Sequence, residues 1–312
     1  MLVSVVVCTH SLNNFGNLQE AVDSLINQTY DQMEIVIVVD GNKELYDVLM
    51  NNYDTSDSIK IVSSNVNIGI SGARNIGIKE AKGDVIAFID DDATADNNWA
   101  TSLVDIYERG DAISVGGKIV PMWLGGKPRY FPEELGWLVG ITHEGFAEEK
   151  VVEIRNTFGP NMSFKREVFD RIGYFNEKLG FGKRGTSYIQ GEEPEFAIRM
   201  KRGMGKGVIY NPAALVYHRI PESKTRPKVL LRRSFYQGYT KALLKRLNPS
   251  PESLSAEGSY LRNVLFKFIP RRLKKVFSLN AIVELEALSL LIASVLSVGL
   301  GFMYGYCKRP SD

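Results

Sequence analysis

Cysteine is scarce in this sequence, and its positions exclude one class of protein. Cys8 and Cys307 lie at opposite ends of the 312-residue chain, and Cys8 stands inside a strongly apolar segment. Small secreted domains that depend on disulfides carry many closely spaced cysteines. The pattern therefore excludes a disulfide framework and fits a reducing compartment.

A secretory leader and repeated segments are also missing. The first residues, MLVSVVVCTH, are apolar but lack a basic start, and the apolar run breaks after eight residues, which predicts a buried strand. We find no internal repeat and no low-complexity tract. An apolar content of 44% and a charged content of 24% are typical of a globular protein with a well-buried core.

Charge is unevenly distributed, although the formal net charge is only +2. Between Lys224 and Lys275 there are fourteen Lys or Arg residues against two acids, Glu252 and Glu257, and the first two hundred residues are correspondingly acidic. Such a basic segment predicts an anionic partner: nucleic acid, phospholipid head groups or a phosphorylated substrate. Its interleaved Leu, Val and Phe are typical of an apolar helix face rather than of base-stacking aromatics, which argues against nucleic acid.

Only one long uncharged segment occurs, near the C-terminus. Leu288 to Tyr306 spans nineteen residues, about the length of a helix that crosses a bilayer, and this predicts membrane attachment. The alternative is a buried C-terminal helix, which the upstream acids Glu284 and Glu286 do not exclude. Basic residues flank the segment on both sides: Arg271, Arg272, Lys274, Lys275, Lys308 and Arg309.

Strand-like and helix-like patterns alternate through the first hundred residues. Apolar runs at 3–7, 34–40, 59–64 and 84–90 predict strands, and segments 17–28, 43–53 and 71–81 have helical spacing. Strict alternation predicts an α/β fold with right-handed crossovers and a mostly parallel sheet covered on both faces. After Trp99 the pattern loosens into strands and loops, and from about Pro221 it becomes helical.

Polar side chains gather where three of these strands end. Thr9 and His10 follow the first strand, Asp40 ends the second, and three adjacent acids, Asp90 to Asp92, end the fourth. Ligands of parallel sheets bind outside the carboxyl ends of the strands. A Mg²⁺ or Mn²⁺ ion between Asp92 and a diphosphate would relieve the repulsion among the acids, the alternative being a solvated acidic turn.

Two further groups strengthen this interpretation. Asp40 is suited to accept a hydrogen bond from a ribose hydroxyl or a base NH. Arg74, at the start of the third helix, is suited to neutralise phosphate or to hold the acids. Glu192 and Glu193 directly precede Pro194, where a helix N-terminus would favour the ionised carboxylate of a general base. The alternative is simple capping. His218, at the end of another predicted strand, is either a third metal ligand or a buried histidine, and spacing alone favours the latter.

The chain from Val3 to His218 resembles family 2 glycosyltransferases, inverting nucleotide-sugar enzymes with a GT-A fold. The motifs that carry the resemblance occur in the expected order: VSVVVCTH, VVDG, NIGISGARNIGI, GDVIAFIDDDA, GPNMSFKREVFDRIGYFNEKLG, GEEPEFAIRMKRG and VYHR. The resemblance implies a UDP-sugar donor, a Mn²⁺ or Mg²⁺ cofactor and Glu193 as the base, with Glu192 beside it. It also implies a metal held by Asp92 with Asp90 and His218, a further contact at Arg199, and nucleotide-sugar contacts from Thr9, Asp40, Arg74, Asn75, Asp90, Asp91 and Asn161.

The chain departs from the family pattern at two places. The family's common Glu-Asp pair is Glu192-Glu193 here, which leaves open which glutamate acts, and Asp40 is followed by Gly41 rather than by a second Asp. The Gln-x-x-Arg-Trp motif of processive synthases is absent, since no Trp follows Trp137. We therefore expect a single transfer to each acceptor.

The C-terminal region indicates the acceptor. A basic amphipathic region (221–278) that leads into a hydrophobic segment and tail (279–312) is typical of a membrane surface element, whereas residues 1–220 form the expected catalytic domain. The layout resembles archaeal enzymes that add a sugar, often a hexuronic acid, to a dolichyl-phosphate-linked glycan for protein N-glycosylation. This implies a lipid-phosphate-linked saccharide acceptor, contact with membrane lipids, and a cell-membrane location with the catalytic domain on the cytoplasmic side.

Three other functions fit parts of the sequence. A nucleotidyltransferase is disfavoured because CTHSLNNFGN offers neither a Gly-x-Gly loop nor a Lys or Arg for phosphate. A non-catalytic membrane scaffold that binds nucleotide sugars is opposed by the presence of Asp92 and Glu193 but stays open. A glycosyltransferase of polysaccharide or lipopolysaccharide synthesis is a further alternative.

Overall fold

The computed structural model describes residues 1–53, 58–147, 149–180, 189–249, 255–277 and 280–308. These residues form two compact units, each assembled from separate stretches of the chain. The first unit comprises Met1–Val120, Glu149–Tyr188 and Glu192–His218, and the second comprises Pro121–Glu148, Ile189–Gly191 and Arg219–Asp312. Segment 121–148 thus belongs with the C-terminal region. Arg309 and the expected boundary at 278–279 lie outside the described residues.

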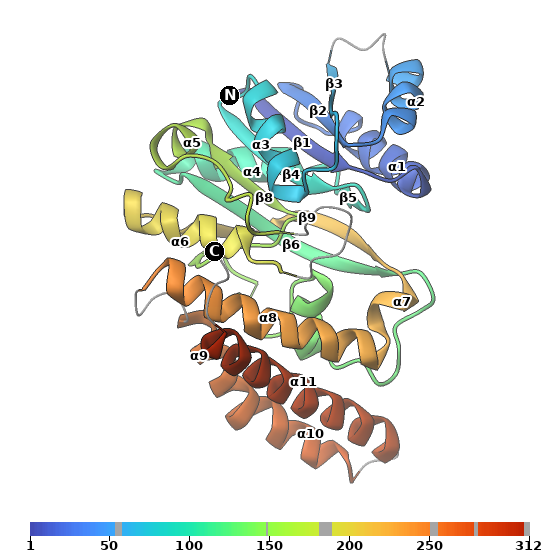
Figure 1. The fold of residues 1–312 in the computed structure, drawn as a ribbon, viewed down its shortest axis with the longest axis vertical. Helices are drawn as coiled ribbons and strands as arrows, with labels where there is room; N and C mark the ends of the chain where they lie inside the picture. Colours follow the sequence, from blue (N-terminus) through green and yellow to red (C-terminus); the bar gives the residue numbers. More distant parts are fainter. Residues whose placement is uncertain (54–57, 148, 181–188, 250–254, 278–279, 309–312) are drawn as a thin grey trace. The chain divides into compact units, whose positions relative to one another are not determined.

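The first unit begins with a four-stranded parallel sheet (Figure 1). Its order is β3 (Ile59–Ser64), β2 (Met33–Asp40), β1 (Val3–Thr9) and β4 (Val85–Asp90). Cys8 lies opposite both Val38 of β2 and Asp90 of β4, so the carboxyl ends of these strands meet at one edge. The strands are rich in Val and Ile, which suit a sheet that is buried on both faces.

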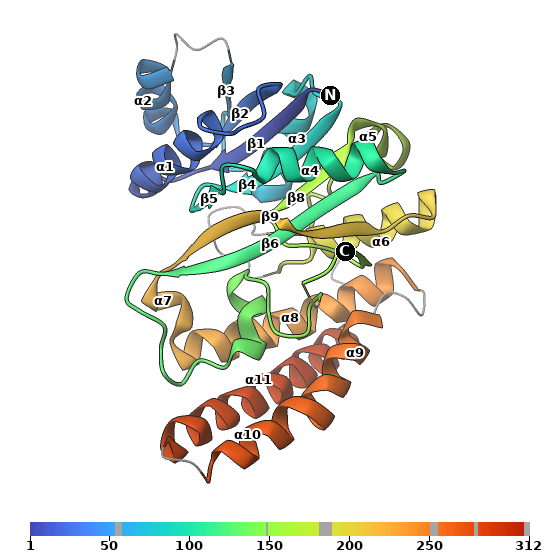
Figure 2. The same cartoon turned by 180° about the vertical axis from the view of Figure 1, so that it is seen from behind.

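Helices cover the two faces of this sheet, as the sequence pattern predicts (Figure 2). Alternate strand residues such as Val5 and Ile37 pack with α1 (Phe15–Ile26), α2 (Lys43–Tyr53) and α4 (Trp99–Arg109). The residues between them, such as Val6 and Phe88, pack with α3 (Ile70–Glu80), α5 (Arg166–Ile172) and α6 (Glu192–Met204). The result is a three-layer α/β/α arrangement, which confirms the predicted fold class.

The remaining strands extend the sheet with antiparallel pairs. Beyond β4 follow β8 (Met162–Lys165), β6 (Ser114–Trp123), β9 (Val208–Ile220) and β5 (Ala93–Ala95), while β7 (Val152–Ile154) pairs with β9. The pairs β4–β8, β6–β8, β5–β9 and β7–β9 are antiparallel. The sheet therefore combines the parallel strands expected from the sequence with antiparallel pairs.

Three element boundaries differ from the sequence predictions. Thr9 is the last residue of β1 rather than the residue after it, and β9 continues past His218 to Ile220. Helix α6 begins at Glu192, so both glutamates lie in its first turn instead of preceding it. Pro194 is the third helical residue, where its missing NH needs no partner inside the helix.

The second unit contains the helices expected after residue 221. They are α7 (Glu222–Thr225), α8 (Pro227–Leu247), α9 (Ser255–Asn263), the π-helical turn η5 (Val264–Phe268), α10 (Ile269–Lys275) and α11 (Ala281–Cys307), with the 3-10 helix η2 (Glu133–Val139). α11 contains the predicted hydrophobic segment. Within the described ranges it is the one helix long and apolar enough to cross a membrane, with 28% of its most apolar stretch buried.

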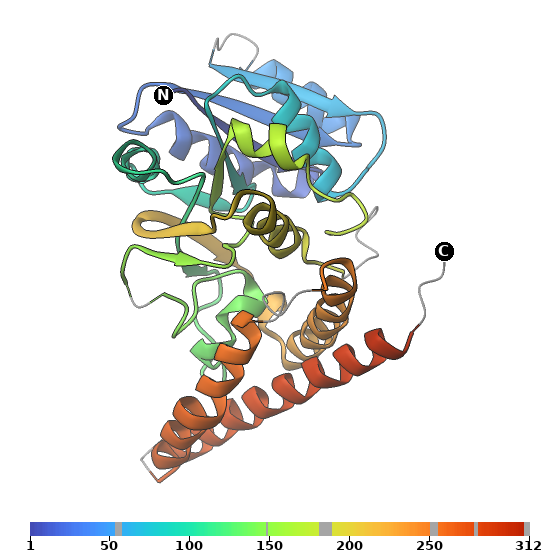
Figure 3. The same ribbon diagram turned by 90° about the vertical axis from the view of Figure 1, so that its left-hand side faces the viewer.

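Helices α8 and α11 run side by side in the same direction (Figures 1 and 3). Ser297 donates a hydrogen bond to the Leu231 carbonyl, and a Cβ atom on Gly301 would lie 1.9 Å from the Phe235 carbonyl oxygen. A Cβ on Gly238 would likewise lie 1.9 Å from the Val298 carbonyl oxygen. Only glycine permits these approaches, so the two helices touch backbone to backbone.

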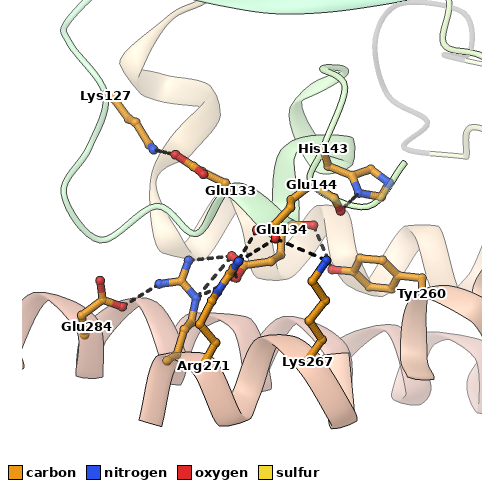
Figure 4. A network of polar contacts seen from close by, with 10 residues as sticks. Lys127, Glu133, Glu134, His143, Glu144, Tyr260, Lys267, Arg271 and Glu284 are labelled. Atoms are coloured by element: carbon orange, nitrogen blue, oxygen red, sulfur yellow. Dashed lines mark hydrogen bonds and ion pairs between the residues drawn. The ribbon is translucent and has the colours of Figure 1, made fainter. Parts of the chain in front are cut away.

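A network of charged side chains joins η2 to α10 and α11 (Figure 4). The fully buried Glu134 carboxylate accepts hydrogen bonds from Arg272 at 2.6 and 3.0 Å and from Arg271 at 2.7 Å. Arg271 also binds Glu144, and Arg272 binds Glu284 in the first turn of α11 at 3.0 Å. These bonds hold the pKa of Glu134 below its usual value despite its burial.

Candidate active site

The acidic cluster and the late histidine meet because β5 pairs with β9. Asp90 ends β4 and Asp92 immediately precedes β5, so a tight turn separates the two strands. Ala93 lies directly opposite His218 in the antiparallel pair. This register places the imidazole Nε2 3.2 Å from Asp92 Oδ1. The sequence motifs VYHR and IDDDA are thus brought together although more than a hundred residues separate them.

Asp90, Asp92 and His218 have the composition of a divalent metal site. Each offers a ligand atom, and the three atoms lie within 4.8 Å of one another. The other imidazole nitrogen of His218, Nδ1, is buried and has no hydrogen-bond partner among the described residues. Carboxylate oxygens with an imidazole nitrogen suit Mn²⁺ and related ions. The residues therefore fit the predicted metal, and the ion would replace the contact between His218 and Asp92.

Arg74 lies close to several carboxylates around the group of Asp90, Asp92 and His218. Its buried guanidinium lies 3.2 Å from Glu192, 3.6 Å from Glu193 and 3.6 Å from Asp90, and it hydrogen-bonds to Glu192. One positive charge therefore faces three carboxylates, all partly or fully removed from water. Burial raises the pKa of Asp90 above its ordinary value even though Arg74 opposes the shift.

Gly159 is a part of the site that sequence reasoning missed. A Cβ atom on this residue would lie 2.4 Å from Arg74 Nη2 and 3.0 Å from Glu193 Oε1. Its backbone amide donates a hydrogen bond to Glu193, which favours the ionised carboxylate. The signal in the sequence is the Gly-Pro pair inside FGPNMSF, because a glycine before a proline often marks a close backbone approach or a turn.

The two glutamates of α6 have different environments. The Glu192 side chain is 4% exposed and bound to Arg74, whereas the Glu193 side chain is 19% exposed. The pKa of Glu193 is raised to about 7, chiefly by burial and then by the charge of Glu192, while Arg74 opposes the shift. Burial and the charge of Glu192 therefore oppose the preference for the ionised carboxylate that a helix N-terminus gives.

Thr9 and Asp91 lie together at the ends of β1 and β4. The Thr9 hydroxyl donates a 2.7 Å hydrogen bond to Asp91 Oδ2. Burial raises the pKa of Asp91 to about 7, and the charges of Asp92 and Asp90 add to the shift. The predicted nucleotide-sugar contacts of Thr9 and Asp91 stay predictions.

Asp40 turns inward at the end of β2. Its carboxylate accepts hydrogen bonds from the Ser64 hydroxyl at 2.9 Å and from the backbone amides of Ile68 at 2.8 Å and Gly69 at 2.9 Å. Gly69 precedes the first residue of α3, so Asp40 fixes the start of the helix that carries Arg74. A direct contact between Asp40 and uridine stays a prediction.

Three other predicted residues have internal partners. Asn75 binds the backbone of Phe175 in both directions, through Nδ2 and Oδ1, and Asn161 receives the Trp99 indole NH and donates to two carbonyls. Arg199 binds Glu195 and the carbonyls of a nearby loop. The predicted substrate contacts of these three residues stay predictions.

Comparison with known sequences identifies related proteins. The family model described as "Glycosyl transferase family 2" matches residues 4–173. A "Glucosyl-dolichyl phosphate glucuronosyltransferase" of Haloferax volcanii is 39% identical over 306 residues, which cover 98% of this chain and 96% of that protein. The "Succinoglycan biosynthesis protein ExoM" of Rhizobium meliloti is 29% identical over 172 residues, which cover 55% of this chain and 51% of that protein.

Solved structures share the fold at low sequence identity. The mannosyltransferase PcManGT of Pyrobaculum calidifontis, in complex with GDP-Man and Mn²⁺, superposes with a TM-score of 0.63 at 16% identity over 95% of this chain and 86% of that one. S. aureus TarS in complex with UDP-GlcNAc gives a TM-score of 0.55 at 15% identity, with 96% and 92% coverage.

Proposed function

The chain belongs to glycosyltransferase family 2 and has the GT-A fold, and we propose that it transfers a sugar, with inversion, from a UDP-sugar to a saccharide linked to dolichyl or polyprenyl phosphate. The observation that carries the proposal is the meeting of Asp90, Asp92 and His218 beside the base candidate Glu193, with Arg74 between them. The relative from Haloferax volcanii supports a hexuronic acid as the sugar and a glycosylated dolichyl phosphate as the acceptor.

The donor diphosphate would bind at the carboxyl ends of β1 and β4. Asp92, Asp90 and His218 would hold a divalent ion there, for which Mn²⁺ and Mg²⁺ are the candidates. When bound, the ion stabilises negative charge on the departing diphosphate. Thr9 and Asp91, joined by their hydrogen bond, would line the nucleoside side, and Asp40 holds the start of α3 in place.

Glu193 would act as the general base. As the acceptor hydroxyl oxygen bonds to the anomeric carbon, the bond from that carbon to the UDP oxygen breaks, and Glu193 takes the hydroxyl proton. A single displacement inverts the anomeric configuration. A carboxylate with a pKa of about 7 is well matched to this role, because it is both available and basic near neutral pH. Glu192, which accepts a hydrogen bond from Arg74, would position Arg74 and raise the pKa of Glu193.

The second unit supports a membrane location. α11 is a candidate membrane helix, and a lipid-linked acceptor would be presented at a membrane surface. We place the catalytic unit on the cytoplasmic side of the cell membrane, because nucleotide sugars are made there. We also propose a role in protein N-glycosylation, although assembly of another surface glycan would use the same chemistry.

The test uses purified full-length protein in detergent with Mn²⁺ and a panel of UDP-sugars, with and without a polyprenyl-phosphate-linked glucose. Release of UDP is measured by a coupled assay. We expect acceptor-dependent release with UDP-glucuronic acid. Metal-dependent UDP binding without release from any donor would contradict the proposal in favour of a non-catalytic scaffold.

A further inference from the structure

The outer face of α11 is an exposed apolar stripe. Leu296 and Leu300 are 63% and 57% exposed, and the exposed apolar residues recur every three, four or seven positions, which places them on one side of the helix. No charged residue interrupts α11 after Glu286. We define this stripe as the following residues of α11: Leu285, Ser289, Ile292, Leu296, Leu300 and Met303.

A second exposed apolar surface lies on α9, η5 and α10. Phe266 and Phe277 are 78% and 92% exposed, more than any other large apolar side chain among the described residues. Leu261, Leu265 and Leu273 continue this surface. Exposed basic residues stand between these apolar ones: Arg262, Lys267, Lys274 and Lys275. The sequence has no acid between Glu257 and Glu284, so the surface combines apolar area with positive charge.

The packing of α8 makes it costly for α11 to cross a bilayer. The two helices are in backbone contact from Leu231 and Ser297 to the end of α11, where Arg246 donates hydrogen bonds to the carbonyls of Tyr306 and Lys308. α8 would therefore enter the membrane alongside α11. It carries six cations along its length: Lys228, Arg232, Arg233, Lys241, Lys245 and Arg246. Lys and Arg are strongly disfavoured at the centre of a bilayer.

The other end of α11 is held by charged groups as well. Glu284 binds Arg272, whose guanidinium also binds the buried Glu134 of η2 (Figure 4). Arg271 and Arg272 belong to the basic segment for which the sequence predicts an anionic partner, and both bind carboxylates inside the unit. Both ends of α11 are fixed to polar parts of the same unit, while its middle exposes only apolar or small side chains.

We propose that the second unit binds the surface of an anionic bilayer with α11 lying in the plane of the membrane. The α11 stripe and the apolar side chains of α9 to α10 enter one leaflet, and Arg262, Lys274 and Lys275 contact the anionic head groups. The Gly301-x-x-x-Gly305 spacing often joins membrane helices of two chains. Here it is used within the chain, because Gly301 faces Phe235 and Gly305 faces Tyr239 and Ala242 of α8. The inference does not depend on the reaction, because these helices contain none of the candidate catalytic residues.

The topology is tested with the native Cys307, which is exposed at the end of α11. Inside-out membrane vesicles from cells that express the full chain are treated with a membrane-impermeant maleimide at pH 7. The Cys307→Ser variant supplies the background from Cys8, whose pKa burial raises to about 12 and whose thiol is therefore unreactive. The substitution Asn51→Cys, added to the Cys307→Ser variant, places a thiol at an exposed position of α2. Its labelling reports on which side of the membrane the first unit lies.

An α11 that lies in the membrane plane gives labelling of Cys307 and of the thiol introduced by Asn51→Cys from the same side, without detergent. Labelling of one before lysis and of the other only after lysis means that α11 crosses the bilayer, and this overturns the proposal. The result is independent of any glycosyl transfer, so a failure of the proposed reaction would not be mistaken for a failure of the topology.

The surface itself is tested by flotation with vesicles of phosphatidylglycerol and phosphatidylcholine. Leu296→Glu and the milder Ser289→Glu should abolish flotation, whereas Val66→Glu, at a similarly exposed apolar residue of the first unit (64%), should not. Lys274→Gln with Lys275→Gln should weaken binding about fivefold for each charge removed, and only when phosphatidylglycerol is present.

Unchanged flotation of folded Leu296→Glu and Ser289→Glu overturns the proposal. If these variants instead convert an oligomer into a monomer and still float, the α11 stripe is a contact between copies of the chain rather than a membrane surface. Thermal unfolding of each variant verifies that the unit is folded, and Ser289→Glu is the informative variant if Leu296→Glu unfolds.

Discussion

Each unit of the chain buries arginine among glutamates, but the balance of charge differs between the two. In the second unit, Arg271 and Arg272 together face Glu134, Glu144 and Glu284, and the pKa values of Glu134 and Glu144 are lowered. In the first unit, one arginine faces three carboxylates, and the pKa of Glu193 is raised to about 7. The same kinds of side chain give a charge-paired network in the second unit and a cluster with excess negative charge in the first.

The difference separates structure from function. A network whose charges are paired can do little besides hold elements together, and removal of one member leaves a buried charge. The cluster around Arg74 has more negative than positive charge, which favours the binding of a cation. It also contains a carboxylate, Glu193, that is basic enough to accept a proton near neutral pH. We therefore propose that Arg74 and its acids serve the reaction, whereas Glu134 and its arginines stabilise the fold.

Glu193→Gln gives the largest expected effect. The amide cannot accept the acceptor proton, so kcat should fall by about 10²–10⁴-fold while UDP binding, followed by calorimetry, is unchanged. Glu195→Gln is the matched control, since Glu195 lies on the same helix and pairs with Arg199 outside the cluster. Activity within a few fold of wild type in Glu193→Gln would remove Glu193 as the base.

Asp92→Asn should lower kcat/KM by about 10²–10³-fold, because a neutral amide is a poor ligand for a hard cation. Mn²⁺ binding, measured by electron paramagnetic resonance, should weaken in parallel. Asp105→Asn serves as the control, since Asp105 forms only an exposed pair with Arg109. Equal Mn²⁺ affinity in wild type and Asp92→Asn would refute the metal site.

Glu134→Gln should affect stability instead of chemistry. Loss of this fully buried charge leaves Arg271 and Arg272 incompletely paired and should cost about 3–5 kcal/mol in the free energy of unfolding. The adjacent Glu133→Gln should cost less than about 0.5 kcal/mol, since the Glu133 side chain is 66% exposed. Denaturant unfolding with UDP binding as a second readout tests both variants, and similar losses in the two would invalidate the comparison.

Glu192→Gln should produce the smallest change, a shift in pH dependence. Removal of this neighbouring charge lowers the pKa of Glu193, so the rise of kcat with pH should move to lower pH. Glu195→Gln should leave the profile in place. An unchanged or alkaline-shifted profile in Glu192→Gln would show that Glu192 does not tune the base.

The sequence predicted the parts of this site that lie along single segments. The parallel strands, the acids after β4 and the two glutamates of α6 were all visible as local patterns, because strand and helix periodicity and strand ends are local. Arg74 was predicted only as one of two roles, since its partner Glu192 is 118 positions away. Whether Arg74 binds phosphate or supports the acids depends on how close Arg74 and Glu192 lie in the folded chain, which the sequence does not give.

The backbone features of the fold could not be predicted in this way. The approach of Gly159 to Arg74 depends on the loop before β8, and the inward turn of Asp40 depends on amides of segment 68–69. The pairing of Arg272 with Glu134 could not be predicted either, because a basic cluster beside an apolar helix has the same sequence pattern whether or not a buried acid faces it.

The pH dependence of kcat for the wild-type protein tests the central claim most directly. A Glu193 carboxylate that must be ionised to accept a proton predicts a kcat that rises through about pH 7 and then levels off, since the base is protonated below its pKa and ionised above it. A kcat that is constant from about pH 5.5 to about 8.5 while transfer is rate-limiting would contradict the account, because no under-neutralised carboxylate would then be taking the proton.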